Sequence, residues 1–122
     1  MSDNYSLTIA EERLAQLIWQ NSPISSPDLV DIAYKYLDWK KSTTYTVLRR
    51  LCEKGIFRNE NAIVTIALTR DELLARQSRQ FVANTFRGSL PGFIAAFVGG
   101  GKISSKDADE LLQLIEAHQE VE

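Results

Sequence analysis

The sequence predicts a mostly α-helical chain with one small β-hairpin, and three observations carry this expectation. Apolar residues recur every three or four positions in several stretches, which is typical of amphipathic helices. Serine or threonine residues stand just before these stretches, where helix caps are found. One short stretch alternates between apolar and polar residues beside a polar turn, as the strands of a hairpin do.

Length and composition indicate a globular protein of one domain or two small ones. The chain has 122 residues, of which 44% are hydrophobic and 25% are charged, as is ordinary for such proteins. No stretch approaches the roughly 18 apolar residues of a membrane span, and the first residues do not resemble a secretory signal. The single cysteine, Cys52, is expected to be an inert thiol and excludes a disulfide within the chain. We therefore expect a cytoplasmic protein that does not insert into a membrane.

Two helices are expected in the first part of the chain. Thr8 and Glu11 fit a capping box, in which the side chain of each residue accepts a hydrogen bond from the backbone amide of the other. The first helix then continues to about Asn21. The second is expected to begin with Ser26 as its cap and Pro27 in its first turn, where the missing amide of proline costs nothing. The expected apolar face of this second helix consists of Leu29, Ile32, Ala33 and Tyr36.

A third helix and the hairpin follow. The helix is expected from about Ser42 to Lys54, ended by Gly55, because glycine adopts the left-handed conformation after a helix easily. Its expected core face consists of Thr44, Val47, Leu48 and Leu51. The hairpin is expected within residues 56–68, with its turn at residues 59–61. Three helices before a hairpin is the order of a winged helix-turn-helix domain, in which the third helix enters the major groove of DNA.

The rest of the chain is expected to be helical. Its residues predict a long helix over 71–87, a short and very apolar helix over 89–98, and a last amphipathic helix capped by Ser104 or Ser105. The glycines at 99–101 are expected to form a flexible break.

These last helices are expected to form a homodimer. So short a region cannot bury this many large apolar side chains alone, and a second copy of the chain is the economical partner. The side chains expected at the dimer interface are Leu74, Phe81, Phe86, Phe93, Ile94, Phe97, Leu111, Leu112 and Ile115. The expected domains are a winged helix-turn-helix DNA-binding domain over 1–70 and a helical dimerisation domain over 71–122.

Positive charge is concentrated in one segment, although the whole chain has a net charge of −2. Residues 40–58 carry six basic side chains against one acidic. In contrast, residues 1–39 carry two basic against six acidic, and residues 59–122 carry six basic against nine acidic. The basic segment coincides with the helix that a winged-helix domain presents to DNA, which favours duplex DNA as the partner. A basic surface that binds an acidic protein instead of DNA is the alternative.

The basic side chains on the third helix are expected to contact phosphates. Such contacts set the affinity and its salt dependence but carry little sequence information. The expected phosphate contacts are Lys40, Lys41, Arg49 and Arg50, with Lys54 along the same flank. For Arg49 the alternatives are exposure to solvent and an ion pair with Glu53.

The hydroxyl groups in the first turns of the same helix are expected to meet base edges, because that part of a recognition helix lies deepest in the groove. These residues are Ser42, Thr43, Tyr45 and Thr46. In the alternative reading the threonines cap the helix or face water, and Tyr45 packs against Trp39.

The residues needed for catalysis are missing from the sequence. His118 is the one histidine and has no neighbouring nucleophile motif, and the glycines at 99–101 follow a helix, where no phosphate loop is found. We therefore expect a protein that is not an enzyme and that holds no cofactor and no metal.

Several segments, in the same order along nearly the whole chain, resemble one known family. Residues 39–55 are similar to the recognition helix of the penicillinase and methicillin-resistance repressors (BlaI/MecI type), and residues 11–19 to the first helix of that family. Residues 68–76, 86–90 and 95–97 resemble its dimerisation region.

This resemblance implies a cytoplasmic homodimer that binds a palindromic operator and represses transcription. In the antibiotic-resistance systems of the family, a membrane sensor-protease responds to β-lactam, and the repressor is cut in its apolar dimerisation helix. The matching bond here joins Ala96 to Phe97. Two features depart from the family: the wing tip at 59–61 lacks basic residues, and the glycines at 99–101 make a looser connection. The last residues lack the cysteine cluster of the copper-responsive branch, so metal sensing is not expected.

Overall fold

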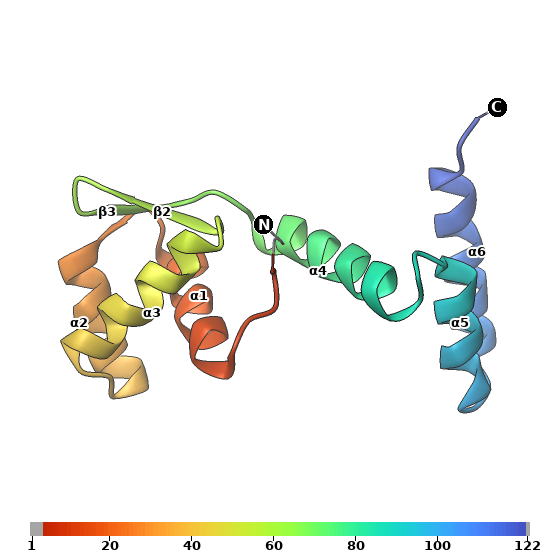
Figure 1. Cartoon of the computed structure of the whole chain (residues 1–122), viewed down its shortest axis with the longest axis horizontal. Helices are drawn as coiled ribbons and strands as arrows, with labels where there is room; N and C mark the ends of the chain where they lie inside the picture. The colour runs from red at the N-terminus through yellow and green to blue at the C-terminus, as the bar shows by residue number, and fades with distance from the viewer. Residues whose placement is uncertain (1–3, 122) are drawn as a thin grey trace. The chain divides into compact units, whose positions relative to one another are not determined.

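The computed structural model describes residues 4–121. Its elements in chain order are α1 (Ile9–Asn21), β1 (Ile24–Ser25), α2 (Ser26–Leu37), α3 (Lys41–Glu53), β2 (Phe57–Glu60), β3 (Ile63–Ile66), α4 (Arg70–Thr85), α5 (Leu90–Gly99) and α6 (Ser105–His118) (Figure 1). The predicted mostly helical class with a small hairpin is confirmed. Within the described range, no helix is long and apolar enough to cross a membrane.

Hydroxyl side chains start most of the helices, as the sequence predicts. Thr8 and Glu11 form the expected capping box, with the Thr8 hydroxyl oxygen accepting from the Glu11 amide and Glu11 Oε1 accepting from the Thr8 amide. The cap of α2 is Ser25, one residue before the predicted Ser26. The remaining hydroxyl caps are Thr69, Ser89 and Ser104.

The sheet is antiparallel, with the strand order β1-β3-β2. Strands β2 and β3 form the predicted hairpin, in which Phe57 pairs with Ile66 and Glu60 with Ile63. The turn begins two residues later than expected, at Asn61, and consists of Asn61 and Ala62, which both have positive φ angles (52° and 61°). Two residues with positive φ make a tight hairpin turn whose twist suits the strands, so residues 59 and 60 remain paired within β2. Strand β1 was not predicted.

The core of the first unit lies between α1, α2, α3 and the sheet. The predicted core face of α3, consisting of Thr44, Val47, Leu48 and Leu51, is buried. Trp19 packs against Phe57, with ring centroids 5.4 Å apart, and its indole nitrogen donates to the Leu68 carbonyl oxygen. Tyr36 was predicted on the buried face of α2 but is 63% exposed. Leu37, which is half-buried against the core at the end of α2, takes the place expected for Tyr36.

The described contacts divide the chain into a first unit that ends at Gln80 and a second unit that begins at Phe81. This division lies inside α4, later than the domain boundary expected after residue 70. The cause is that α4 as far as Gln80 belongs to the first unit, where Leu73 is buried in the same core as Leu68.

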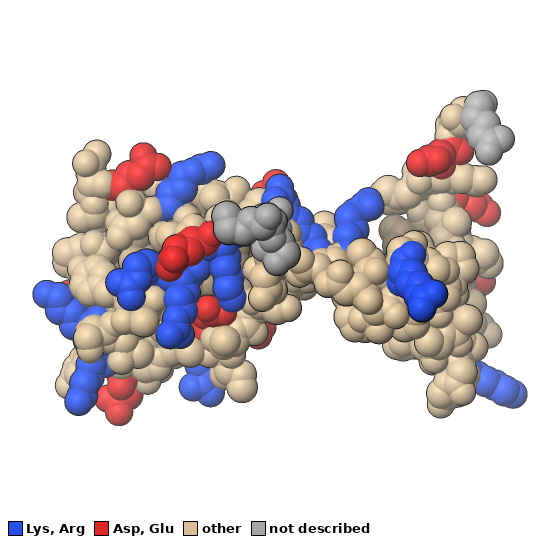
Figure 2. Space-filling view, in the orientation of Figure 1, with Lys and Arg blue, Asp and Glu red and all other residues tan. Residues whose placement is uncertain are grey.

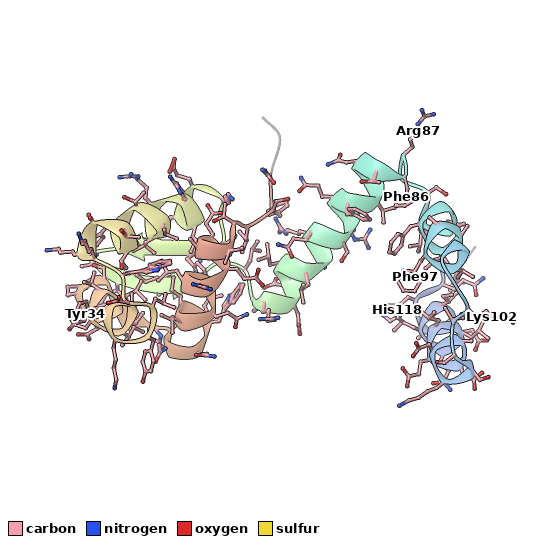
Figure 3. All side chains as sticks on the ribbon, turned by 90° about the horizontal axis from the view of Figure 1, so that it is seen from below. Tyr34, Phe86, Arg87, Phe97, Lys102 and His118 are labelled. Carbon is pink, nitrogen blue, oxygen red and sulfur yellow. The ribbon has the colours of Figure 1, made fainter. Side chains whose placement is uncertain are left out.

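The second unit contains the end of α4, α5 and α6. Phe81, Phe86 and Phe93 meet edge to face, with ring centroids 5.5 to 5.8 Å apart, and Phe97 extends the cluster from Phe93. Figure 3 labels two members of this cluster, Phe86 and Phe97. The break between α4 and α5 is at Arg87 and Gly88, which both have positive φ. Neither α5 nor α6 contains a buried side chain.

Candidate nucleic-acid interface

Helix α3 begins without a side-chain cap. Lys40 is its N-cap residue, and no side chain accepts a hydrogen bond from the first-turn amides. The other five helices each begin with a hydroxyl that accepts from such an amide. The side chains of Lys41, Ser42 and Thr43 are all exposed in this first turn. The amides and the positive end of the helix dipole therefore suit an external anion such as a phosphate.

The four basic residues predicted to contact phosphate are free of ion pairs. Lys40, Lys41, Arg49 and Arg50 are exposed. Across residues 4–121 the one ion pair joins Lys54 to Glu11, so the alternative pair between Arg49 and Glu53 does not form. Figure 2 shows Lys and Arg side chains over the part of the first unit where α3 crosses the view in Figure 1. The positive charge of this helix is therefore available to a polyanion.

Lys54 does not belong to this free basic surface, which corrects the expectation from the sequence. Its ammonium nitrogen lies 2.7 Å from Glu11 Oε1 and 2.7 Å from the Ser6 carbonyl oxygen. Burial raises the pKa of the Glu11 carboxyl, but the hydrogen bonds from Lys54 and the Thr8 amide outweigh burial and lower it overall. Lys54 therefore joins the end of α3 to the start of α1.

The predicted base-reading residues differ in exposure. Ser42 and Thr43 are exposed, whereas Tyr45 and Thr46 are half-buried. Tyr45 packs against the core, and its hydroxyl lies 3.5 Å from Ser26 Oγ, at the outer limit of a hydrogen bond. The Lys41 ammonium nitrogen lies 6.0 Å from the Tyr45 ring centroid. Among the described residues Tyr45 makes no ring contact with Trp39, so its alternative packing partner is Ser26 on α2 instead.

Cys52 lies in the last turns of the same helix. It is half-buried against the core, and burial raises the pKa of its thiol. Reactive cysteines have a lowered thiol pKa, so these surroundings suit a packing role.

The second unit carries an apolar surface of its own. A groove of about 490 Å³ runs between α5 and α6. Its apolar lining includes Phe93, Ile94, Phe97, Leu111 and Leu114. Of the predicted dimer residues, all except Leu74 lie in this second unit, whereas Leu74 lies on the first half of α4.

Leu114 is a member of this apolar surface that the sequence reasoning missed. It is exposed in the single chain and lines the groove between α5 and α6. Its spacing of three from Leu111 was the available signal, since such residues share a helix face.

Together, the order of the elements, the hairpin wing and the third helix identify a winged helix-turn-helix fold. Winged helix-turn-helix folds characteristically serve gene regulation through the helix that precedes the wing.

The chain belongs to the penicillinase repressor family, whose sequence profile matches residues 7–117. It is 21% identical over 115 residues to the methicillin resistance regulatory protein MecI of Mammaliicoccus sciuri, covering 91% of this chain and 94% of that protein. It is 20% identical over 113 residues to the penicillinase repressor of Staphylococcus aureus, covering 89% and 90%. A 16.5 kDa protein of Latilactobacillus sakei is 24% identical over 122 residues, covering 96% and 84%. Family membership identifies the chain as a transcriptional repressor and not an enzyme.

Proposed function

We propose that the chain is a cytoplasmic homodimer that represses transcription by placing α3 in the major groove of a palindromic operator. The observation that carries this proposal is a coincidence on one helix. Helix α3 carries four exposed cations that pair with no acidic group among residues 4–121. Its first turn also has no side-chain cap. Both features favour phosphate on either side of a groove, and both lie on the helix that precedes the wing.

The exposed side chains of α3 divide into two roles. Lys40, Lys41, Arg49 and Arg50 contact the phosphate backbone and set the salt dependence. Ser42 and Thr43, which are exposed in the first turn, read base edges through their hydroxyl and methyl groups. Thr46 lies one turn further along and contacts bases as well. Tyr45 is held by packing against α2, with its hydroxyl 3.5 Å from Ser26 Oγ, and contacts DNA with the part of its side chain that stays exposed.

A second copy of the chain is the proposed cover for the apolar surface of the second unit. Phe97 is 68% exposed, and Leu112, Leu114 and Ile115 on α6 are each 58% exposed in the single chain. Exposed apolar side chains in this number are typical of an obligate interface and not of a soluble monomer. A two-fold dimer also presents two α3 helices to two half-sites, which a palindrome requires.

The test is a selection of duplexes from a random pool, followed by titration of the selected and a scrambled duplex at two salt concentrations. The proposal predicts preference for the selected duplex and a steep loss of affinity as salt rises. The Lys41→Ala variant is expected to reduce the salt slope by about one, whereas Lys102→Ala, an exposed lysine of the second unit, leaves it unchanged. Equal binding to every duplex would instead favour a module that binds an acidic protein.

We further propose that the repressor is inactivated by a membrane sensor-protease that cuts between Ala96 and Phe97. The family resemblance motivates this step, and both residues are exposed near the end of α5. Cutting there separates α6 from the rest of the second unit, and a dimer that depends on both helices then dissociates. Mass spectrometry after incubation with such a protease tests it: an intact bond between Ala96 and Phe97 in protein that has lost its operator contradicts this step.

A further inference from the structure

The segment before α1 joins the end of α3 to the first half of α4. We call residues 5–7 the strap. The Ser6 carbonyl oxygen accepts a hydrogen bond of 2.7 Å from Lys54, the C-cap residue of α3. Leu7 and Tyr5 are half-buried against the core of the first unit. The strap is therefore fixed to the part of the fold that presents α3.

On its other side the strap makes hydrogen bonds to α4 through Tyr5. The Tyr5 amide donates to Gln80 Oε1 at 3.2 Å, and the Tyr5 carbonyl oxygen accepts from Gln77 Nε2 at 2.8 Å. Arg76 donates to the Tyr5 hydroxyl at 2.9 Å, and its guanidinium carbon lies 5.5 Å from the ring centroid. Because residues spaced by three and four share one side of a helix, Tyr5 holds a single face of α4 over successive turns.

Among the described residues, full burial of a side chain holds this part of α4 at one point. Leu73 is its one buried side chain in the described range. One buried side chain near the start of a helix anchors a point and leaves the direction of the helix poorly restrained. Three polar residues bound to Tyr5 further along the same helix supply the missing restraint.

We infer that Tyr5 is a positioning residue for operator recognition. It fixes the direction of α4 relative to α3, and α4 is continuous from Arg70 to Thr85, so that it continues past Phe81, the first residue of the second unit. The direction of α4 therefore sets the separation at which a dimer offers its two α3 helices to DNA. This inference rests on the proposed function, because it concerns how a dimer recognises two half-sites.

The experiment compares Tyr5→Ala with Tyr5→Phe and the matched control Ser6→Ala, which leaves the backbone carbonyl that binds Lys54. Affinity is measured for the selected operator, for operators with one or two base pairs added or removed between the half-sites, and for a single half-site. Tyr5→Ala is expected to weaken binding to the selected spacing by about fivefold to tenfold, because a hydrogen bond and a cation–π contact are lost. Tyr5→Phe keeps the ring beside Arg76, so it is expected to weaken binding about half as much as Tyr5→Ala does, on a logarithmic scale of affinity. The affinity of Tyr5→Ala for a single half-site is expected to equal that of the wild type. Ser6→Ala is expected to bind every duplex as the wild type does.

The pattern across duplexes separates positioning from simple stability. If Tyr5→Ala weakens binding to the single half-site as much as to the selected operator, Tyr5 only stabilises the fold and the inference is wrong. An unchanged preference for the selected spacing also overturns it.

A measurement without DNA separates this inference from the proposed function. Spin labels on Gln20→Cys in α1 and Asn84→Cys in α4, in a Cys52→Ser background diluted with unlabelled chain, report the distance between the first unit and the end of α4. The distance distribution is expected to broaden in Tyr5→Ala, and an unchanged distribution overturns the inference. If the wild-type protein prefers no duplex, the proposed function is refuted. The distances between the two spin labels then still decide whether the strap holds α4.

Discussion

Replacing Lys54 by methionine tests how the end of α3 is held to the start of α1. Lys54 Nζ lies 2.7 Å from Glu11 Oε1, and the Glu11 side chain is only 3% exposed. Methionine keeps most of the side-chain volume but removes the charge and both hydrogen bonds of the ammonium group. The Glu11 carboxylate then remains buried with the Thr8 amide as its donor.

The expected loss of stability follows from this burial. Removing one partner of a buried ion pair costs about 3–5 kcal/mol. The Lys54 side chain is 23% exposed, so water reaches part of the pair, and we expect a loss of about 2–3 kcal/mol. This is a large share of the roughly 5–15 kcal/mol by which most domains are stable.

The pH dependence supplies a second signature with a defined sign. In the wild type, folding lowers the pKa of Glu11. The Glu11 carboxylate therefore contributes to stability above its unfolded-state pKa of about 4.3, and this contribution is lost as pH falls through its folded-state pKa. Without Lys54, burial raises the Glu11 pKa and only the Thr8 hydrogen bonds oppose it. At a given low pH the folded variant then binds more protons at Glu11 than the folded wild type does, so the stability deficit of the variant relative to the wild type shrinks as pH falls from neutral.

Urea unfolding at a fixed protein concentration, followed by the fluorescence of the two tryptophans, Trp19 and Trp39, measures these free energies. Glu11→Gln and the double variant complete a cycle that isolates the interaction between the two side chains. A loss below about 0.5 kcal/mol for Lys54→Met, the range of an ordinary surface substitution, would refute the reasoning. So would a deficit that is the same at every pH.

Three further changes test other parts of the account. Arg50→Ala is expected to weaken binding to all duplexes alike and to lower the salt slope by about one in titrations, and a changed base preference would contradict its assignment to phosphate. Phe97→Asp is expected to weaken the dimer at least about tenfold in sedimentation equilibrium while the first unit stays folded, because this side chain is exposed in the single chain; an unchanged dimer places the interface elsewhere. Gly55→Ala is expected to lower the free energy of unfolding by about 1–2 kcal/mol, because φ is 79° at this residue. No atom lies within 4 Å of the added methyl, so the loss comes from the backbone alone, and no loss in urea unfolding would mean that the turn relaxes.

Local chemistry made much of the fold predictable. The capping box at Thr8 and Glu11, the proline in the first turn of α2 and the glycine that ends α3 all act through neighbours within a few residues. The apolar spacing on α3 likewise identified the side chains that are buried, since the helix period alone decides which share a face.

The features that were missed depend on residues far apart in the sequence. Strand β1 has two residues and forms only because Ile24 pairs with Val64. Lys54 was assigned to the basic surface because its partner, Glu11, lies 43 positions away. No local pattern predicts such pairings.

The candidate site was predictable in location more than in detail. The excess of positive charge at residues 40–58 identified α3, and four of its cations are exposed. The half-burial of Tyr45 depends on Ser26 of α2, which only the packing of the two helices brings near. The role of Tyr5 had no signal in the sequence, because its partners lie at Arg76, Gln77 and Gln80.

The most direct test of the account is the complex between the protein and a duplex selected by it. Native mass spectrometry counts the chains on each duplex, and methylation protection reports contact with guanine N7 in the major groove. The account predicts two chains per duplex and two clusters of protected guanines centred about 10 base pairs, or a multiple of this, apart. One chain per duplex, or guanine N7 that stays fully reactive throughout the bound site, would contradict a dimer that places α3 in two major grooves.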